Sequence, residues 1–212
     1  MKPYYEHGGI TIYHGDCRDI LPLIADAALT LTDPPYGLGD RWQGGTWGAA
    51  EMYKDARQWD QEPIDPETMR LVLSKAPRSI VWGGNYYPMP ASRCWLAWVK
   101  TSRMDTMADM ELAWTNLDRP AKLMEEDRNP DGRRQHPTQK PESLMRWCIK
   151  LAGGEGLVLD PFMGIGTTLR AAKDAKRKAI GIDLSERYCE IAAKRLSQEV
   201  LPLGLSSDLD LP

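Results

Sequence analysis

A carboxylate, two prolines and an aromatic ring stand together in the stretch TDPPYG, directly after a strand-like run. Pro34 and Pro35 have no backbone N–H, and their fixed φ aims the neighbouring carbonyl oxygens in a set direction. With Asp33 as a further acceptor, the turn suits an exocyclic amino group, because each of its two hydrogens needs an acceptor. Tyr36 can stack on the face of the same heterocycle. A plain turn after a strand is the alternative for this stretch taken alone.

A second stretch, LDPFMGIGTT at 159–168, places glycines between an apolar run and a helix-like run. Gly164 and Gly166 let a ligand approach the backbone, and the N–H groups that open the next helix attract a negative group such as a carboxylate. Asp183 lies about 20 residues further on, where an acidic side chain can accept hydrogen bonds from a ribose diol. The pattern predicts a nucleotide-like cofactor site, with a glycine turn needed only for packing as the alternative.

Two details of this second stretch argue against NAD as the cofactor. Thr167 and Thr168 follow the glycines, so the third glycine of the dinucleotide fingerprint is missing. Asp160 and Pro161 precede the loop together with Phe162, which is the only phenylalanine of the chain. A ring at that place suits a small cofactor, although a single core phenylalanine would be equally ordinary.

The elements that must position these motifs follow the α/β pattern. From 157 to 197 the order is strand, loop, helix, strand and helix, which is a parallel βαβ unit that the N-terminal strands complete. Ser185 caps the last helix, and Pro141 opens an earlier one that ends at Gly153. The predicted strands are 10–14, 28–32, 79–82, 95–99, 110–114, 157–159 and 179–182, and the predicted helices are 141–152, 167–175 and 185–197.

Three motifs in this order, DPPYG (33–37), HPTQKP (136–141) and DPFMGIGTT (160–168), resemble those of the S-adenosylmethionine-dependent DNA amino-methyltransferases. GDC (15–17) and GIDLSERY (181–188) fit the same pattern, so the resemblance covers nearly the whole chain. Because the acceptor motif precedes the glycine loop, the chain resembles the β group, whose motif order is circularly permuted. The resemblance implies a Rossmann-like fold with a mostly parallel twisted sheet and helices on both faces.

The resemblance also implies roles for individual residues. It makes the turn from Asp33 to Tyr36 catalytic and S-adenosylmethionine the cofactor. Ile165 stands where a small Ser is commoner in the family. The cofactor residues that it implies are Asp16 and Cys17 near the adenine ring, Asp183 at the ribose, Thr138 and Lys140 at the carboxylate, and Asp160, Phe162, Gly164, Gly166, Thr167 and Thr168 around the methionine part.

The expected acceptor is adenine N6 in double-stranded DNA, since cytosine-N4 enzymes of this family more often carry Ser where the chain has Asp33. The base would be flipped out of the duplex and methylated directly, without a covalent enzyme intermediate or a metal ion. Cytosine N4 stays open as the alternative acceptor. Two other classes also stay open, namely a catalytically inactive DNA-binding protein of the same fold and an NAD-dependent oxidoreductase.

Two segments are the candidates for contacts with DNA. The glycine-rich loop 37–60 carries Arg41, Trp42 and Trp47, which either engage DNA as a mobile lid or pin the loop to the surface. The segment 116–135 occupies the slot of the family's target-recognition insert, and it is predicted to be short and turn-rich. Its candidate phosphate or guanine contacts are Arg128, Arg133 and Arg134. A solvated charged face is the alternative explanation for these arginines.

Composition bounds the remaining possibilities. The 212 residues predict one domain over 1–200 and a disordered tail over 201–212. The net charge of −3 means that DNA must be held by a local patch. No apolar run approaches the roughly 20 residues of a membrane span, and the four scattered cysteines favour a reducing cytoplasm over a zinc site or disulfides. Relatives in the β group are often dimers, so a homodimer is also expected.

Overall fold

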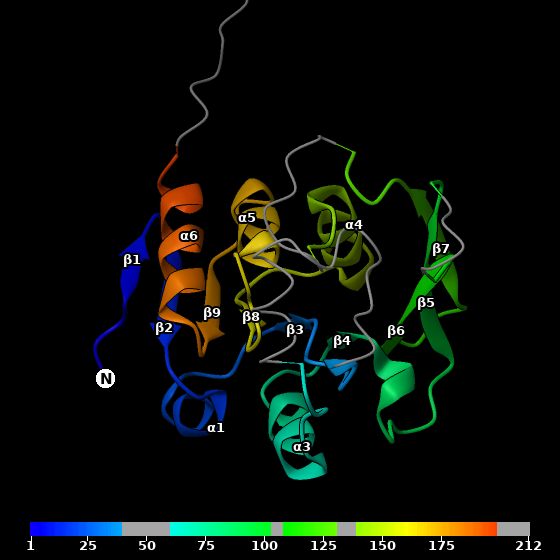
Figure 1. Cartoon of the computed structure of the whole chain (residues 1–212), viewed down its shortest axis with the longest axis horizontal. Coiled ribbons are helices and arrows are strands. Elements are labelled where there is room, and N and C mark those ends of the chain that lie inside the picture. The colour runs from blue at the N-terminus through cyan, green and yellow to red at the C-terminus, as the bar shows by residue number, and fades with distance from the viewer. Residues whose placement is uncertain (40–59, 103–107, 131–138, 199–212) are drawn as a thin grey trace, which may run out of the picture.

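A mixed sheet runs through the residues that the computed structural model describes, which are 1–39, 60–102, 108–130 and 139–198 (Figure 1). Its strand order is β1-β2-β9-β8-β3-β4-β6-β5-β7. The run from β2 to β4 is parallel, β6 lies antiparallel between β4 and β5, and β7 pairs parallel with β5. The strands are β1 (Tyr5–His7), β2 (Ile10–His14), β3 (Leu29–Thr32), β4 (Ser79–Trp82), β5 (Cys94–Lys100), β6 (Met110–Thr115), β7 (Lys122–Glu126), β8 (Val158–Asp160) and β9 (Ala179–Asp183).

Helices cover both faces of the parallel part of the sheet. Figure 1 shows α4, α5 and α6 in a row on one side, with α1 and α3 on the other. Two short 3₁₀ helices, η1 (Leu21–Leu23) and η4 (Gly84–Tyr86), follow α1 and β4. The α-helices are α1 (Cys17–Ile20), α3 (Pro66–Ser74), α4 (Glu142–Ala152), α5 (Thr167–Asp174) and α6 (Glu186–Ser197).

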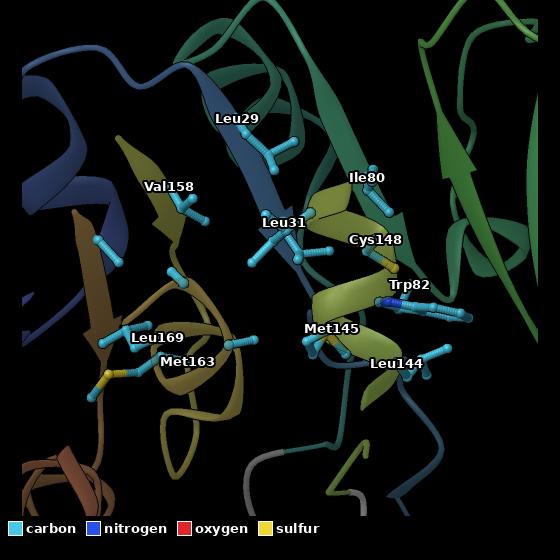
Figure 2. Packing of buried hydrophobic residues seen from close by; sticks show 14 of the residues in the cluster. Leu29, Leu31, Ile80, Trp82, Leu144, Met145, Cys148, Val158, Met163 and Leu169 are labelled. Carbon is cyan, nitrogen blue, oxygen red and sulfur yellow. The ribbon is translucent and has the colours of Figure 1, made fainter. Parts of the chain in front are cut away.

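The core lies on both faces of the sheet because side chains alternate along each strand. In β8, Val158 belongs to the cluster beneath α4, α5 and α6, whereas its neighbour Leu159 packs with residues of α1 and α3. Figure 2 shows Leu31 and Trp82 of the sheet beside Cys148 of α4. Each such fully buried aliphatic side chain contributes about 1.5–3 kcal/mol by leaving water. This packing holds the ends of β3 and β8 in place.

The loops that carry the two motifs meet at the carboxyl ends of β3 and β8. β3 and β8 are parallel neighbours, and Leu29 pairs with Val158. From β3 the sheet continues to β4 on one side, and from β8 it continues to β9 on the other. Ligands of open α/β sheets bind in the crevice beyond the carboxyl ends of strands at such a switch point. The sequence 32–37 therefore faces the sequence 160–168 across this crevice.

The helix α4 is anchored at its carboxyl end by two arginines that satisfy its last carbonyl groups. Arg78 Nη1 donates to Ala152 O at 3.0 Å and to Gly153 O at 2.8 Å, and Arg119 Nη1 donates to Leu151 O at 2.6 Å. Carbonyls at a helix end have no partner within the helix, so such donors stabilise the end. Anchoring α4 fixes the direction of the segment that leads into it, which carries Lys140.

The predicted α/β class and permuted order are confirmed, and the predicted elements lie within one or two residues of those observed. Among the described residues, the strands β1 and β7, the helices α1 and α3 and the 3₁₀ helices η1 and η4 were not predicted. The prediction of a turn-rich segment over 116–135 was wrong for Lys122–Glu126, which forms β7. This edge strand is mostly exposed, so its sequence lacks the apolar alternation of a covered strand. The segment 201–212, predicted to be a disordered tail, lies outside the described residues.

No helix within the described ranges has both the length and the apolar character needed to cross a bilayer.

Candidate active site

The turn Asp33–Tyr36, which was predicted to be catalytic and is called the catalytic turn below, follows β3. The residues of β3 are all buried, so the sheet fixes where the turn begins. Asp33 accepts hydrogen bonds from the Tyr36 hydroxyl and the Lys140 ammonium. Burial raises the pKa of Asp33, and the positive charge of Lys140 opposes that rise. Burial also raises the pKa of Tyr36, so its hydroxyl keeps the proton that it donates. Two donors thus orient the carboxylate that was predicted to accept a hydrogen bond from an amino group.

Asp60 holds the backbone of this turn, although it was not predicted. Its carboxylate is buried and accepts hydrogen bonds from the backbone N–H groups of Tyr36 at 2.6 Å, Gly37 at 2.8 Å and Leu38 at 3.3 Å. On the other side of the turn, the Tyr87 hydroxyl donates to the Pro35 carbonyl oxygen. Buried N–H groups need partners, and one carboxylate here satisfies three in a row. Asp60 therefore fixes the chain immediately after the prolines.

The ring of Tyr36 lies among further residues that the motif does not include. It stacks on Tyr86 with the ring centroids 4.8 Å apart and an interplanar angle of 16°. Gly83, with φ of +68°, lies so close that a β-carbon there would overlap ring carbon Cε1. The Lys140 ammonium is 5.6 Å from the Tyr36 ring centroid and equally far from that of Trp82. The position of the Tyr36 ring thus depends on a missing side chain at Gly83.

Lys140 has different contacts from those that the resemblance implied. Its ammonium bonds Asp33 and lies 3.2 Å from Glu111 Oε2, and it is almost fully buried. Burial alone would lower the pKa of Lys140, but the carboxylates of Asp33 and Glu111 raise it overall. Lys140 therefore stays charged. It was expected to hold the cofactor's carboxylate, and because Lys140 lines the cavity as well as bonding Asp33, that role stays a prediction.

The strand β8 ends at Asp160, which joins the two motif-bearing strands. Its carboxylate accepts hydrogen bonds from Thr32 Oγ1 at 2.7 Å and from the backbone N–H of Phe162 at 3.2 Å. Burial raises the pKa of Asp160 to about 6. Because Thr32 is the last residue of β3, this contact links the catalytic turn to the glycine loop. Asp160 is thus buried between the two loops, and it is not among the residues that line the cavity.

The glycine loop is shaped by Asp183 at the end of β9. One oxygen of Asp183 accepts from the Gly164 N–H at 2.9 Å and the other from the Ser185 N–H at 2.8 Å. Burial raises the pKa of Asp183 to about 7. Gly164 and Gly166 have φ of +51° and +78°, a region that side chains rarely adopt. The backbone conformation thus favours glycine at both positions, in addition to the predicted approach of a ligand.

The loop after β2 contributes Asp16, which caps α1. The Asp16 carboxylate accepts from the Arg18 backbone N–H at 2.8 Å and pairs with the Arg18 guanidinium at 2.5 Å. The hydrogen bonds from Arg18, above all, lower the pKa of Asp16. Cys17 is buried beside it, and burial raises the pKa of its thiol to about 12, so it is neutral. Asp16 is therefore a charged carboxylate at the far end of the site.

One cavity of about 450 Å³ joins these parts. Its volume falls in the range of about 300–1,000 Å³ that is usual for cofactor sites. A β-carbon on Gly164 would project into open space, so the missing side chain leaves room at the cavity wall. The predicted residues that line it are Asp16, Cys17, Asp33, Pro35, Lys140, Phe162, Gly164, Thr167, Thr168 and Asp183. Pro34, Tyr36, Asp160 and Gly166 lie in the same two loops and are not among the residues that line the cavity.

The residues present fit S-adenosylmethionine. The first N–H groups of α5, at Thr167 and Thr168, have no partner within the helix and can receive a carboxylate. Asp183 offers carboxylate oxygens to hydroxyl groups, and Phe162 adds an apolar ring. Within the described ranges, no group of three or more His, Cys, Asp or Glu side chains is placed to hold a metal ion.

The predicted DNA contacts are mostly outside the described residues. This holds for Arg41, Trp42, Trp47, Arg133 and Arg134, and also for the cofactor residue Thr138. Arg128 is described, and it follows β7, where its Nη2 lies 3.5 Å from the Ala108 carbonyl oxygen. The structure therefore places one predicted DNA contact near the β7 edge and leaves the others as predictions.

Several residues of the site were missed by the motifs. Asp60, Glu111 and Lys100 are charged side chains whose partners are distant in sequence, so no local spacing reveals them. Gly83, in the GGN stretch after β4, could have been found as a glycine turn at the carboxyl end of a strand. Arg18 stands two residues after Asp16, but a surface arginine is too common to single out.

The known proteins that this chain resembles in sequence are DNA methyltransferases. The family model described as DNA methylase, for the N6/N4 methyltransferases, matches residues 74–194. The Type II methyltransferase M.ScaI of Streptomyces caespitosus is 27% identical, over 95% of this chain and 86% of its own length. M2.LlaDCHI of Lactococcus lactis subsp. cremoris, also a Type II methyltransferase, is 27% identical over 93% of both chains.

Solved structures agree with the fold. The PvuII DNA methyltransferase, described as cytosine-N4-specific, superposes with a TM-score of 0.66 at 19% identity, over 94% of this chain and 90% of its own. The complex of M1.HpyAVI with S-adenosylmethionine gives a TM-score of 0.57 at 22% identity, over 89% of this chain and all of its own. With the family match covering more than half of the chain, the protein belongs to the N6/N4 DNA methylases and is a DNA methyltransferase that uses S-adenosylmethionine.

Proposed function

We propose that this enzyme methylates the N6 amino group of adenine in double-stranded DNA, with Asp33 and Tyr36 holding the base. The observation that carries the proposal is the single cavity, which Asp33 and Pro35 share with Gly164, Thr168 and Asp183. A group that accepts amino hydrogens and a loop that suits a nucleoside cofactor thus open into the same space.

The cofactor supplies a methyl group on a positively charged sulfur. The N–H groups that open α5 would hold its carboxylate, and Asp183 would hold its ribose hydroxyls. Phe162 would contribute apolar contact beside the methionine part, and Asp16, which also lines the cavity, would lie near the adenine. These residues orient one reactant, and orientation in well-aligned systems can supply roughly 7–11 kcal/mol of the barrier.

The base must leave the duplex, since its amino group cannot reach the site while it is stacked. The Asp33 carboxylate and the Pro34 carbonyl oxygen each accept one amino hydrogen, and the base stacks on Tyr36 in place of Tyr86, which occupies that position in the structure. Each carboxylate oxygen has two acceptor sites, so Asp33 can bind the base without losing Tyr36 and Lys140. These bonds draw the nitrogen lone pair out of ring conjugation.

Asp33 also receives the proton. The amino nitrogen becomes acidic only as the new bond forms, so a strong base is not needed. Burial raises the pKa of Asp33, which makes its carboxylate a better proton acceptor than an exposed one. Lys140 stays protonated throughout, because the carboxylates of Asp33 and Glu111 raise its pKa.

Cytosine N4 is the second candidate acceptor. The observation that favours it is the PvuII enzyme, a cytosine-N4-specific neighbour with a TM-score of 0.66. Its amino group could meet the same two acceptors. Asp33 favours adenine, because the cytosine enzymes that this chain resembles more often carry Ser there.

The test combines product analysis with a matched pair of variants. The protein is incubated with unmethylated duplex DNA and labelled S-adenosylmethionine, and the methylated nucleosides are identified by mass spectrometry. Asp33→Ala should lower the rate by at least about 100-fold. Asp26→Ala, an exposed carboxylate before the amino end of β3, should leave the rate unchanged.

Each outcome decides between the candidates. N6-methyladenine that is lost in Asp33→Ala supports the proposal, and N4-methylcytosine would replace it by the second candidate. Absence of both products, in protein that binds S-adenosylmethionine and duplex DNA, would contradict the proposal and favour an inactive DNA-binding protein.

A further inference from the structure

A second carboxylate, Glu111, lies behind the catalytic turn and is held there by Lys100. Lys100 Nζ lies 2.6 Å from Glu111 Oε1, and the Lys100 side chain is only 8% exposed. The Lys100 ammonium also sits 5.1 Å from the Trp98 ring centroid. The antiparallel register of β5 and β6 pairs Trp98 with Glu111, which brings these side chains together. The Glu111 side chain is 26% exposed, so this ion pair is partly buried, and the buried ammonium holds the carboxylate in place.

The ammonium of Lys140 lies between two carboxylates from different strands. It bonds Asp33 after β3 and is 3.2 Å from the second oxygen of Glu111 in β6. The four groups form a continuous row in the order Lys100, Glu111, Lys140 and Asp33, with two positive and two negative charges. Charges that are buried need such partners, because removing one leaves the next uncompensated.

Glu111 competes with Asp33 for the same ammonium. Lys140 Nζ also lies 3.1 Å from the Tyr36 hydroxyl oxygen, so its three hydrogens face Asp33, Tyr36 and Glu111. Without Glu111, the ammonium would be drawn entirely to Asp33 and Tyr36. A carboxylate held more tightly by a cation is a weaker acceptor for an amino hydrogen and for a proton.

We propose that Glu111, held by Lys100, is a positioning residue that keeps Lys140 at a fixed place and thereby sets how strongly Asp33 is neutralised. The inference rests on the proposed role of Asp33 as the acceptor of the amino hydrogens. It gives β5 and β6 a part in the reaction, although neither strand contributes a residue to the lining of the cavity.

The direction of each effect follows from the charges. Lys140 and Lys100 together lower the pKa of Glu111 to about 2 against the effect of burial, so it is ionised. Removing its negative charge should lower the pKa of Asp33, because Glu111 raises that pKa, whereas removing the positive charge of Lys100 should raise it. The other titratable groups that interact with Asp33 or Lys140 are Tyr36, Tyr87, Asp160 and Cys148.

The experiment compares Glu111→Gln and Lys100→Met by two readouts. The first is the pH profile of kcat, whose acidic limb should move to lower pH in Glu111→Gln and to higher pH in Lys100→Met. The second is the titration of the Asp33 carboxyl carbon by NMR in the free protein, assigned with Asp33→Asn. At neutral pH, kcat should fall by about 10- to 100-fold in Glu111→Gln, while cofactor affinity stays unchanged.

The chain offers a matched control and a rescue. Glu190 and Lys194 form an exposed pair with the same 2.6 Å separation on α6, so Glu190→Gln and Lys194→Met should shift neither readout. Glu111→Asp keeps the charge and should restore most of the activity. Shifts in the same direction for both core variants, or no shift, would overturn the inference.

The two readouts separate this inference from the proposed function. Suppose that the wild-type protein makes no methylated base, but that the pKa of Asp33 moves in opposite directions in Glu111→Gln and Lys100→Met. The positioning role then stands and the acceptor proposal fails. If methylation is normal and the titration does not move, the positioning role fails alone.

Discussion

At the scale of single residues, Gly83 shows how the site depends on a side chain that is missing. Its backbone has φ of +68°, and a β-carbon there would overlap the ring of Tyr36. Tyr36 also donates to Asp33, so moving the ring moves the donor that orients the carboxylate. A residue that touches neither the cavity nor the base thus controls two groups that the motif does name.

Gly83→Ala should reduce methylation strongly, because Tyr36 must shift to make room for the methyl group. We expect kcat to fall by about 100-fold, the loss typical of a small misplacement of reacting groups. The measurement is steady-state kinetics with duplex DNA, together with the Kd of S-adenosylmethionine, which should not change.

The matched control for this prediction is Gly153→Ala. Gly153 has nearly the same φ, +63°, but a β-carbon there meets nothing within 4 Å. Gly153 has ψ of −169° where Gly83 has ψ of +18°, so Gly153→Ala carries the larger backbone strain, and yet only Gly83→Ala should lose activity beyond the loss of stability. Equal kcat values for the two variants would show that Tyr36 does not depend on Gly83.

At the scale of elements, the loops after β3 and β8 are held from outside their own sequences. The catalytic turn is bonded by Asp60, and the glycine loop by Asp183 at the end of β9. Thr32 and Asp160 join the two strands that carry these loops. Such contacts make the loops rigid, which suits a reaction that depends on orientation.

Asp60→Ala should destabilise the turn, since it leaves the buried N–H groups of Tyr36, Gly37 and Leu38 without their acceptor. Unfolding by urea should show a loss of about 2 kcal/mol or more. Because the turn carries Asp33, we also expect kcat to fall while the affinity for S-adenosylmethionine is retained. Asp118→Ala is the control, because Asp118 is an exposed carboxylate whose partner Arg93 is exposed as well.

At the scale of the whole molecule, a net charge of −3 hides strong local differences. Burial raises the pKa of Asp160 to about 6 and that of Asp183 to about 7, whereas the lysines lower that of Glu111 to about 2. Between about pH 4 and pH 7, folded Asp183 therefore holds a proton that the unfolded chain has released. Because the folded state binds this extra proton, the free energy of unfolding falls as the pH rises through this window.

Replacing Asp183 by Asn removes this dependence. Relative to the wild type, the free energy of unfolding of Asp183→Asn should rise between pH 5 and pH 8, on the order of 2 kcal/mol. Urea unfolding without cofactor at three pH values measures the difference, and Asp118→Asn, a highly exposed carboxylate, should show none. A difference that falls with pH would contradict the raised pKa of Asp183.

The sequence by itself determined the α/β class, the order of the motifs and the two loops that meet in the cavity. Local rules carry this information: glycines between a strand and a helix, prolines after a buried strand, and a serine that caps the last helix are each readable within a few residues. Asp33, Gly164 and Asp183 could therefore be predicted before the fold was known.

Only the tertiary structure decided what surrounds those residues. Asp60, Glu111 and Lys100 reach the site through strand register and loop closure, and Lys140 bonds Asp33 across 107 positions of the chain. Side chains so far apart in sequence meet because the packing of the sheet and its helices fixes their backbones, and no local pattern records that geometry. The same reason explains β7, an edge strand that exists because β5 offers it a partner.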